Sequence, residues 1–225
     1  MDLTRCSFSR VYLRFAIFAL IFGFIDAQKN RVPQKWTDGI VPYKISKRFA
    51  PAELKLILES LAVISEKTCV KFKPFKGETS FIQISLGMQC QSAIGRTGGA
   101  QSLLLARNCL NQRSILRELM HVLGFNDEHL RSDRDQFITV NLNNVGEGDR
   151  IFFEKLSDQE LPRFGLPYDY DSVLQVPANW KVDPKASPSA VTIVPKAGKG
   201  VSQLGRSQTL THLDINKISS LYGCK

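Results

Sequence analysis

The sequence predicts a two-lobed α+β fold for residues 28–225, in which a mixed sheet and two long helices form the lobe of about 28–123. An irregular lobe of about 124–225 follows and ends in a helix. Three observations support this prediction: apolar residues alternate in short segments before residue 106, two stretches have helical spacing, and a capped helix closes the chain. We see no repeat and no second domain, and the length suits a single domain.

Strand-like and helical segments follow one another in mixed order in the first lobe. Pro51 is suited to a first helical position, and the apolar residues after it recur with near-helical spacing (Leu54, Ile57, Leu58, Leu61 and Ile64). The segments predicted as strands are 40–46, 69–72, 81–86 and the part of 95–106 that follows a glycine pair.

The stretch 115–123 predicts the central helix. Ile115, Leu119, Val122 and Leu123 have the spacing of a packed stripe. Other apolar residues extend the stripe nearly all round, so we expect a buried helix, and Gly124 marks its end.

The chain is predicted to close on a helix, because Thr211 and Asp214 have the spacing of a capping box. The apolar residues after the box share one face (Ile215, Ile218 and Leu221). After the central helix the composition loosens, and 187–205 reads as loop with one short strand at 191–194.

The first residues have the pattern of a secretory signal: three arginines, an apolar run at 15–25, and the small residue Ala27. We expect residues 1–27 to be a signal peptide and the mature protein to be secreted and extracellular. The alternative is an uncleaved anchor, but the run is too short to span a bilayer comfortably, and no later stretch would span one.

Cysteine usage agrees with secretion. Of five cysteines, Cys6 lies in the predicted signal, which leaves Cys69, Cys90, Cys109 and Cys224. An even set in an oxidising compartment predicts two disulfides, and the spacing leaves all three pairings open.

The formal net charge is +9, and lysines recur at 67–76 and again at 181–199. An acidic polysaccharide is therefore a sensible extracellular partner, although solubility alone also explains such a charge. Nucleic acid is not expected, because the chain has a secretory signal and no known reader motif.

Arg117, Glu118 and His121 interrupt the apolar central helix and lie on one side of it. The zinc signature H-E-x-x-H needs two imidazoles one turn apart, with the Glu as general base. Here Arg117 stands at the first imidazole position, and Asp127 stands where the longer motif places a third ligand. A guanidinium has no lone pair for a metal, so tight zinc binding is not expected, and no cofactor is expected.

The sequence around this helix resembles the astacin family, secreted zinc endopeptidases of the metzincin group. Six blocks in the family's order carry the resemblance: WTDGIVPY (36–43), KTCVKF (67–72), GRTGGAQ (95–101), GFNDEHLRSDRD (124–135), YDYDSV (168–173) and DINKISSLYGC (214–224). The resemblance implies the metzincin fold, with Glu118 at the position of the general base and His121 as the remnant of three zinc-binding histidines. The family's Met-turn, S-x-M-H-Y, reads SVLQV at 172–176.

The resemblance implies three further features. The disulfides should be Cys69–Cys224 and Cys90–Cys109. Glu128 should meet the mature N-terminal amine, with no pro-segment expected before residue 36. The region 95–106 should form the strand at the edge of the cleft, where an extended peptide could pair; an ordinary sheet edge is the alternative.

These departures predict a catalytically inactive pseudoprotease that binds a peptide or protein in the vestigial cleft, or an anionic matrix. The alternative is a zinc-dependent metalloendopeptidase that hydrolyses extracellular peptide bonds through an atypical site of Glu118, His121 and Asp127, with His129 recruited by a shift in register. We further hypothesise that Arg117 pairs with Asp127 or Glu118 in place of a metal; its alternative is a side chain that reaches solvent.

Overall fold

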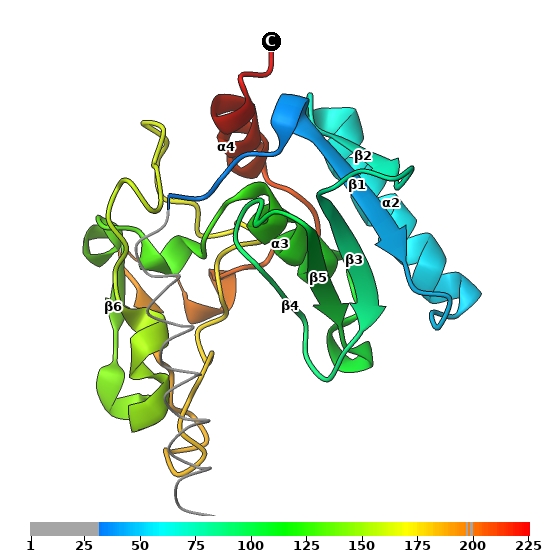
Figure 1. Cartoon of the computed structure of the whole chain (residues 1–225). Coiled ribbons are helices and arrows are strands. Elements are labelled where there is room, and N and C mark those ends of the chain that lie inside the picture. Colours follow the sequence, from blue (N-terminus) through cyan, green and yellow to red (C-terminus); the bar gives the residue numbers. More distant parts are fainter. Residues whose placement is uncertain (1–31, 197, 199) are drawn as a thin grey trace, which may run out of the picture. The chain divides into compact units, whose positions relative to one another are not determined.

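A computed structural model of the chain describes residues 32–196, 198 and 200–225. The predicted signal peptide at 1–27 and the predicted mature N-terminus at Gln28 lie outside the described residues. The described part has the predicted α+β composition, with a mixed sheet packed against helices (Figure 1).

Five strands form the main sheet in the order β2-β1-β3-β5-β4. All neighbouring pairs are parallel except β4 and β5, which are antiparallel. The strands are β1 (Ile40–Ile45), β2 (Lys71–Pro74), β3 (Phe81–Leu86), β4 (Gln91–Ser92) and β5 (Ala100–Leu105). A separate antiparallel pair is formed by β6 (Ile138–Val140) and β7 (Ile193–Pro195).

The edge strand next to β5 in the main sheet is not the predicted one. β5 is an inner strand, because it pairs with β3 on one side and with β4 on the other. The Cys90–Cys109 disulfide joins the residue before β4 to the turn after β5 and so holds β4 at the edge. The prediction that 95–106 forms the edge strand is therefore wrong. Strands β2 and β7 also begin two residues later than predicted.

Helix α2 (Pro51–Lys67) begins at proline, as predicted, and the Glu53 carboxylate accepts a hydrogen bond from the N–H of Ala50 at 2.7 Å. Its buried stripe is narrower than the apolar pattern indicated. Ile57, Leu61 and Ile64 are buried, whereas Leu54 and Leu58, which share the same spacing, are exposed.

Helix α3 (Gln112–Leu123) is the buried central helix that the sequence predicted. Asn111 caps its first turn by accepting a hydrogen bond from the N–H of Ser114 at 2.9 Å. Gly124 ends it with a φ of 112°, a left-handed conformation that glycine adopts without steric cost. Every residue from Leu119 to Leu123 is buried.

Helix α4 (His212–Tyr222) carries the predicted capping box of Thr211 and Asp214. Ile218 on this helix is buried in the same hydrophobic cluster as α2, α3 and the main sheet. Val173 and Leu174 join that cluster as well, so segments late in the sequence return to the first core. A second cluster surrounds β6 and β7 (Ile138, Val145, Phe153, Tyr168, Val176, Ala178, Ile193 and Leu204).

Seven short 3-10 helices lie among the described residues: Thr37–Gly39, Arg107–Cys109, Glu128–Leu130, Arg134–Gln136, Leu142–Asn144, Glu147–Phe153 and Val201–Gln203.

Two disulfides, Cys69–Cys224 and Cys90–Cys109, have the pairing that the resemblance implied. In the described part of the chain, none of the helices combines the length and the apolar character needed to cross a bilayer.

Candidate functional site

The side chains predicted at the metal position lie together at the C-terminal half of α3. Glu118 and His121 are buried, with 1% and 6% of their surface exposed, and Asp127 is buried shortly after the helix. The Arg117 side chain is 23% exposed and is therefore only partly buried. The turn at Gly124 folds the chain back and brings Asp127 within hydrogen-bond distance of Arg117.

Arg117 contacts both neighbouring carboxylates. Its Nε and Nη2 donate to the two oxygens of Asp127 at 2.8 and 2.6 Å, which is a bidentate pair. Its Nη1 donates to Oε1 of Glu118 at 3.0 Å. The hypothesis that Arg117 pairs with a carboxylate is therefore confirmed, and with both carboxylates at once. The alternative of an unpaired side chain in solvent is wrong.

Arg117, Glu118, His121 and Asp127 form a cluster, called the Arg117 cluster below, whose charge depends on the contact between Arg117 and Asp127. Burial alone would raise the pKa of Asp127, but the Arg117 guanidinium and the nearby imidazoles outweigh it and lower that pKa to about 2. Burial likewise acts to lower the pKa of Arg117, yet the two carboxylates raise it above its ordinary value. Both partners of the bidentate pair are therefore charged throughout the physiological range.

Glu118 has a second partner that sequence reasoning missed. The hydroxyl of Ser92, on β4, donates to Oε2 of Glu118 at 3.0 Å. Each oxygen of the predicted general base is thus hydrogen-bonded by a side chain of the protein. The Ser92–Glu118 contact depends on how β4 pairs with β5, and no motif in the sequence signalled it.

His121 offers one nitrogen to the cluster. Its Nδ1 lies 2.7 Å from the carbonyl oxygen of Phe125, so Nδ1 carries the proton that this carbonyl accepts. The other nitrogen, Nε2, faces Asp127, 3.7 Å from Oδ1. The imidazole is therefore oriented with Nε2 toward Asp127 and Nδ1 toward the backbone.

The residues present do not fit a catalytic zinc ion. A tetrahedral catalytic site needs three protein ligands and an open position, whereas this cluster supplies one imidazole nitrogen and one carboxylate that is already bound to a guanidinium. Within residues 32–196, 198 and 200–225, no three His, Cys, Asp or Glu side chains are grouped so that they could hold a metal ion. The recruitment of His129 by a register shift stays a prediction; in this structure Nε2 of His129 lies 3.0 Å from the carbonyl oxygen of Phe152.

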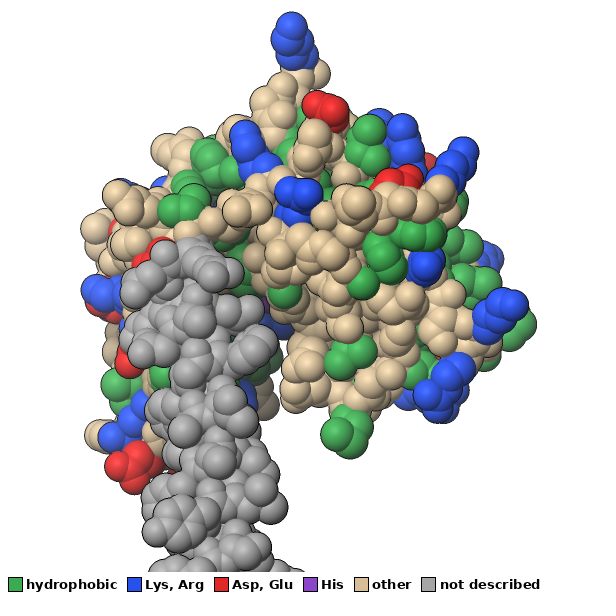
Figure 2. Space-filling model, viewed as in Figure 1, with side chains coloured by type: hydrophobic (Ala, Val, Ile, Leu, Met, Phe, Trp, Pro, Cys, Tyr) green, Lys and Arg blue, Asp and Glu red, His purple; other side chains and the backbone are tan. Residues whose placement is uncertain are grey.

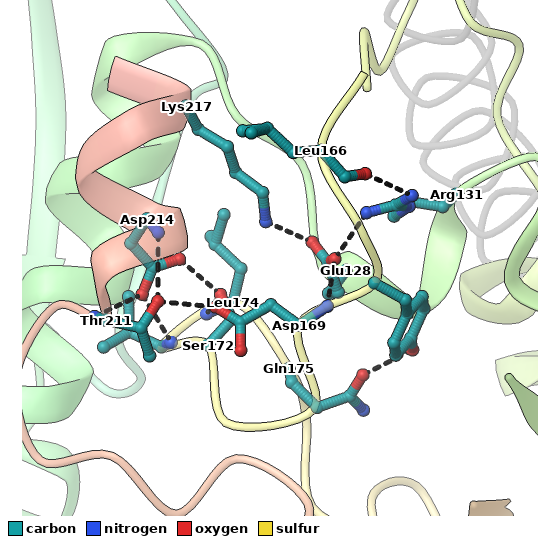
Figure 3. Close-up of polar contacts among 12 residues, drawn as sticks. Glu128, Arg131, Leu166, Asp169, Ser172, Leu174, Gln175, Thr211, Asp214 and Lys217 are labelled. Atoms are coloured by element: carbon teal, nitrogen blue, oxygen red, sulfur yellow. Dashed lines mark hydrogen bonds and ion pairs between the residues drawn. The ribbon is translucent and has the colours of Figure 1, made fainter. Parts of the chain in front are cut away.

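The segment at the family's Met-turn is buried and held by α4. The Ser172 hydroxyl donates to Oδ1 of Asp214 at 2.5 Å, and the Val173 N–H donates to Oδ2 at 3.2 Å (Figure 3). Gln175 accepts a hydrogen bond from the Tyr168 hydroxyl at 2.5 Å. Val176, in the place of the family's tyrosine, is buried and apolar. The turn is thus retained as structure and presents no hydroxyl to the Arg117 cluster.

Glu128 is the centre of a second buried cluster. Its carboxylate contacts Nη1 of Arg131 at 2.9 Å and the ammonium of Lys217 on α4 (Figure 3). It also accepts a hydrogen bond from the N–H of Asp169 at 2.9 Å. Two cations therefore satisfy Glu128 from within the described chain. The prediction that Glu128 meets the N-terminal amine stays a prediction, because residues 28–31 lie outside the described part.

His129 is fully buried and lacks one hydrogen bond. Its Nε2 lies 3.0 Å from the carbonyl oxygen of Phe152, while Nδ1 has no hydrogen-bond partner among the described residues. The rings of Phe153 and Trp180 pack edge-on around it, with centroids 5.6 and 5.1 Å away. This burial lowers the pKa of His129 to about 4.

His129 should make the protein sensitive to mild acid. Its folded pKa lies below the unfolded value of 6.5, so stability is complete above pH 6.5 and is lost as pH falls toward 4. The shift corresponds to a loss of about 3 kcal/mol over that window. Urea denaturation at a series of pH values should show this slope, and His129→Gln should remove most of it.

His212 gives the control for this measurement, because it is the exposed histidine at the start of α4. The variant His212→Gln should keep the wild-type slope. An unchanged slope in His129→Gln would contradict the assignment.

Comparison with known proteins places the chain among the peptidases of one family. The family model "Astacin", which describes a peptidase family, matches residues 28–223. Zinc metalloproteinase nas-6 of Caenorhabditis elegans is 34% identical over 201 residues, which cover 89% of this chain and 57% of that protein. Astacin-like metalloprotease toxin 1 of Loxosceles intermedia is 33% identical over 209 residues, covering 90% of this chain and 77% of the toxin.

A solved structure agrees with the sequence relatives. The hatching-enzyme zinc-protease High choriolytic enzyme 1 of Oryzias latipes superposes with a TM-score of 0.77 at 28% identity, over 86% of this chain and 94% of that one. The chain spans about half the length of the nematode relatives it matches, 57% of nas-6 and 50% of nas-7.

Proposed function

Since this chain belongs to the astacin family of peptidases, we propose that it is a secreted pseudoprotease, a member that binds a peptide or protein and does not cleave it. The main support is the guanidinium of Arg117, which lies between Asp127 and Glu118 at the position of a zinc ligand. Secretion is supported by the signal-like first 27 residues and by the two disulfides.

A permanent cation at this position opposes a metal in two ways. It repels a divalent ion, and it occupies the carboxylate lone pairs that would otherwise coordinate one. Zinc would have to displace the Arg117–Asp127 pair, and His121 would then be its only imidazole ligand. The free energy of breaking a buried bidentate ion pair therefore counts against metal binding.

The general base also lacks its usual setting. A catalytic carboxylate removes a proton from a water whose pKa the metal lowers. Glu118 instead accepts hydrogen bonds from Arg117 and Ser92. Its role in this chain is to balance the charge of Arg117 and to link α3 to β4.

The proposal is tested with the purified, disulfide-bonded protein. After dialysis with zinc, elemental analysis should find far less than one zinc per chain, and a fluorogenic peptide library should show no cleavage above that of the variant Glu118→Gln. Stoichiometric zinc with Glu118-dependent cleavage would establish the alternative, an active zinc-dependent metalloendopeptidase with an atypical site.

A second variant tests whether positions 117 and 127 correspond to the zinc-ligand positions of the family. Arg117→His combined with Asp127→His restores imidazoles at both changed positions, and we expect it to retain zinc that the wild type does not. Cobalt substitution gives a readout apart from activity, because tetrahedral cobalt has intense visible absorption bands. If neither the wild type nor the double variant retained zinc, the conclusion would rest on the elemental analysis and the cleavage assay of the wild type.

A further inference from the structure

One face of the main sheet is not covered by helices α2 and α3. Val41, Ile82 and Ile84 point into the core that contains both helices. Neighbouring residues of a strand point to opposite faces, so Lys44 and Phe81 point away from that core. Pro42 pairs with Lys73 in the parallel β1–β2 register, which places Lys73 on the same outer face.

Exposed lysines outnumber carboxylates at this face, where Glu78 is close enough to Lys76 for their charges to attract. Lys44, Lys73 and Lys76 are exposed, and none forms an ion pair with a described residue. The carboxylate of Glu78, the acidic residue closest to them in sequence, accepts a hydrogen bond from the backbone N–H of Lys76 at 2.6 Å. In Figure 2, lysine and arginine side chains are frequent on the side where Figure 1 places β1, β2 and α2.

In the second half of the chain, several basic residues form ion pairs with carboxylates. Lys155 pairs with Asp135 at 2.7 Å, Lys181 pairs with Asp149 at 2.8 Å, and Arg163 pairs with Asp158 at 2.6 Å. Six cations beyond residue 130 form ion pairs with described carboxylates (Arg131, Arg134, Lys155, Arg163, Lys181 and Lys217). Positive potential remains at the outer face of β1 and β2.

The ammonium group of Lys44 contacts the aromatic rings of Phe75 and Phe81. The ammonium of Lys44 lies 3.8 Å from the ring centroid of Phe75 and 4.8 Å from that of Phe81, and the two rings are 4.5 Å apart. Cation–π contact attracts the ammonium without neutralising its charge. The result is an oriented cation beside half-buried aromatic surface, with further lysines along the adjoining strand and loop.

We propose that this β1–β2 basic face, defined by Lys44, Lys73, Phe75, Lys76 and Phe81, binds a sulfated polysaccharide. Sulfate groups supply the anions for the ammonium groups, and the apolar C–H face of a pyranose ring suits the aromatic surface beside Lys44. An extended polyanion can follow the strand direction, along which alternate residues are about 7 Å apart.

The same face is poorly suited to a membrane. Stable binding to a lipid surface usually combines basic residues with apolar side chains that insert below the headgroups. The exposed large hydrophobic residues of the described chain are Val32, Leu54, Leu58, Met88, Leu142, Phe152 and Val201, and none of them belongs to this face. The polysaccharide is therefore the occupant that the charges and rings favour. This proposal is independent of the loss of peptidase activity, because it uses no residue of the Arg117 cluster.

The test uses heparin and the whole secreted chain. We expect wild-type protein to bind heparin at physiological salt, and the triple variant Lys44→Gln/Lys73→Gln/Lys76→Gln to bind at least about tenfold more weakly, with a shallower salt dependence. The charge-preserving triple Lys44→Arg/Lys73→Arg/Lys76→Arg should bind nearly as wild type. Isothermal calorimetry gives the dissociation constants, and thermal melting verifies that each variant is folded.

A matched control removes the same net charge elsewhere. Lys155→Gln/Lys181→Gln/Lys185→Gln lies in the second half of the chain and should weaken heparin binding by less than about threefold. Equal losses in the two triple variants would overturn the proposal, because they would show attraction by net charge alone. Absence of heparin binding, or tighter binding to phosphatidylserine vesicles or to duplex DNA than to heparin, would overturn it as well.

Discussion

Replacing Arg117 with methionine is expected to lower the free energy of unfolding by about 3–5 kcal/mol. Methionine is similar in length to the arginine stem but carries no charge, so Asp127 and Glu118 would face each other without their shared cation. Both carboxylates are buried, and removing one partner of a buried ion pair leaves an uncompensated charge. Urea denaturation at pH 7, followed by circular dichroism, measures the loss.

Arg163 provides the matched control for this variant. Its side chain is 40% exposed and pairs with Asp133 and Asp158, so Arg163→Met should cost much less stability than Arg117→Met. Neutralising the whole cluster with Arg117→Met/Glu118→Gln/Asp127→Asn should recover much of the stability, because no buried charge remains. Equally small losses for Arg117→Met and Arg163→Met would contradict a stabilising role of the ion pairs between Arg117 and its two carboxylates.

Removing the Cys69–Cys224 disulfide should be the other large effect. This bond closes a sequence separation of 155 residues, and the chain-entropy treatment assigns such a closure about 5 kcal/mol. It joins the segment between α2 and β2 to the residues that follow α4, so the end of the chain is tied to the main sheet. Cys69→Ala/Cys224→Ala should lower the urea midpoint accordingly under non-reducing conditions.

The shorter disulfide calibrates the measurement. Cys90–Cys109 closes a separation of 19 residues, for which the same treatment gives about 3 kcal/mol. Cys90→Ala/Cys109→Ala should therefore be the milder variant, with its loss concentrated at β4. A reversed order of the two losses would mean that local strain, and not loop closure, dominates at these bonds.

The parts of the site that lie on one helix could be predicted from the sequence. The spacing of Ile115, Leu119 and Val122 defined α3, and Gly124 defined its end. Because Arg117 and Glu118 lie on this helix and Asp127 follows its turn, the chemistry of the three side chains sufficed to predict their pairing. Local periodicity and the cost of a buried charge both operate over short separations.

Contacts between distant segments could not be predicted in this way. Ser92 is 26 residues from Glu118, and Lys217 is 89 residues from Glu128. Neither contact leaves a periodic trace, because each depends on how β4 or α4 packs against α3 and the turn after it. The edge strand was misassigned for the same reason: the apolar pattern of β5 identifies a strand but does not reveal its neighbours.

The α2 helix shows a different limit. Leu54 and Leu58 have the spacing of a buried stripe, yet they are 38% and 41% exposed. Helix α2 lies at the side of the fold, where only its face toward the sheet and α3 is covered. Spacing predicts which residues share a face, but the width of the covered face depends on the neighbouring elements.

The Arg117 cluster also bears on how this lineage could change. A descendant that acquired histidine at position 117 would first lose the cation of Asp127 and Glu118, while still lacking a full set of ligands. One that acquired histidine at 127 first would keep an arginine in the way of a metal. Each single step is therefore expected to cost stability while the set of zinc ligands is still incomplete. A full set of imidazole ligands would need both substitutions together.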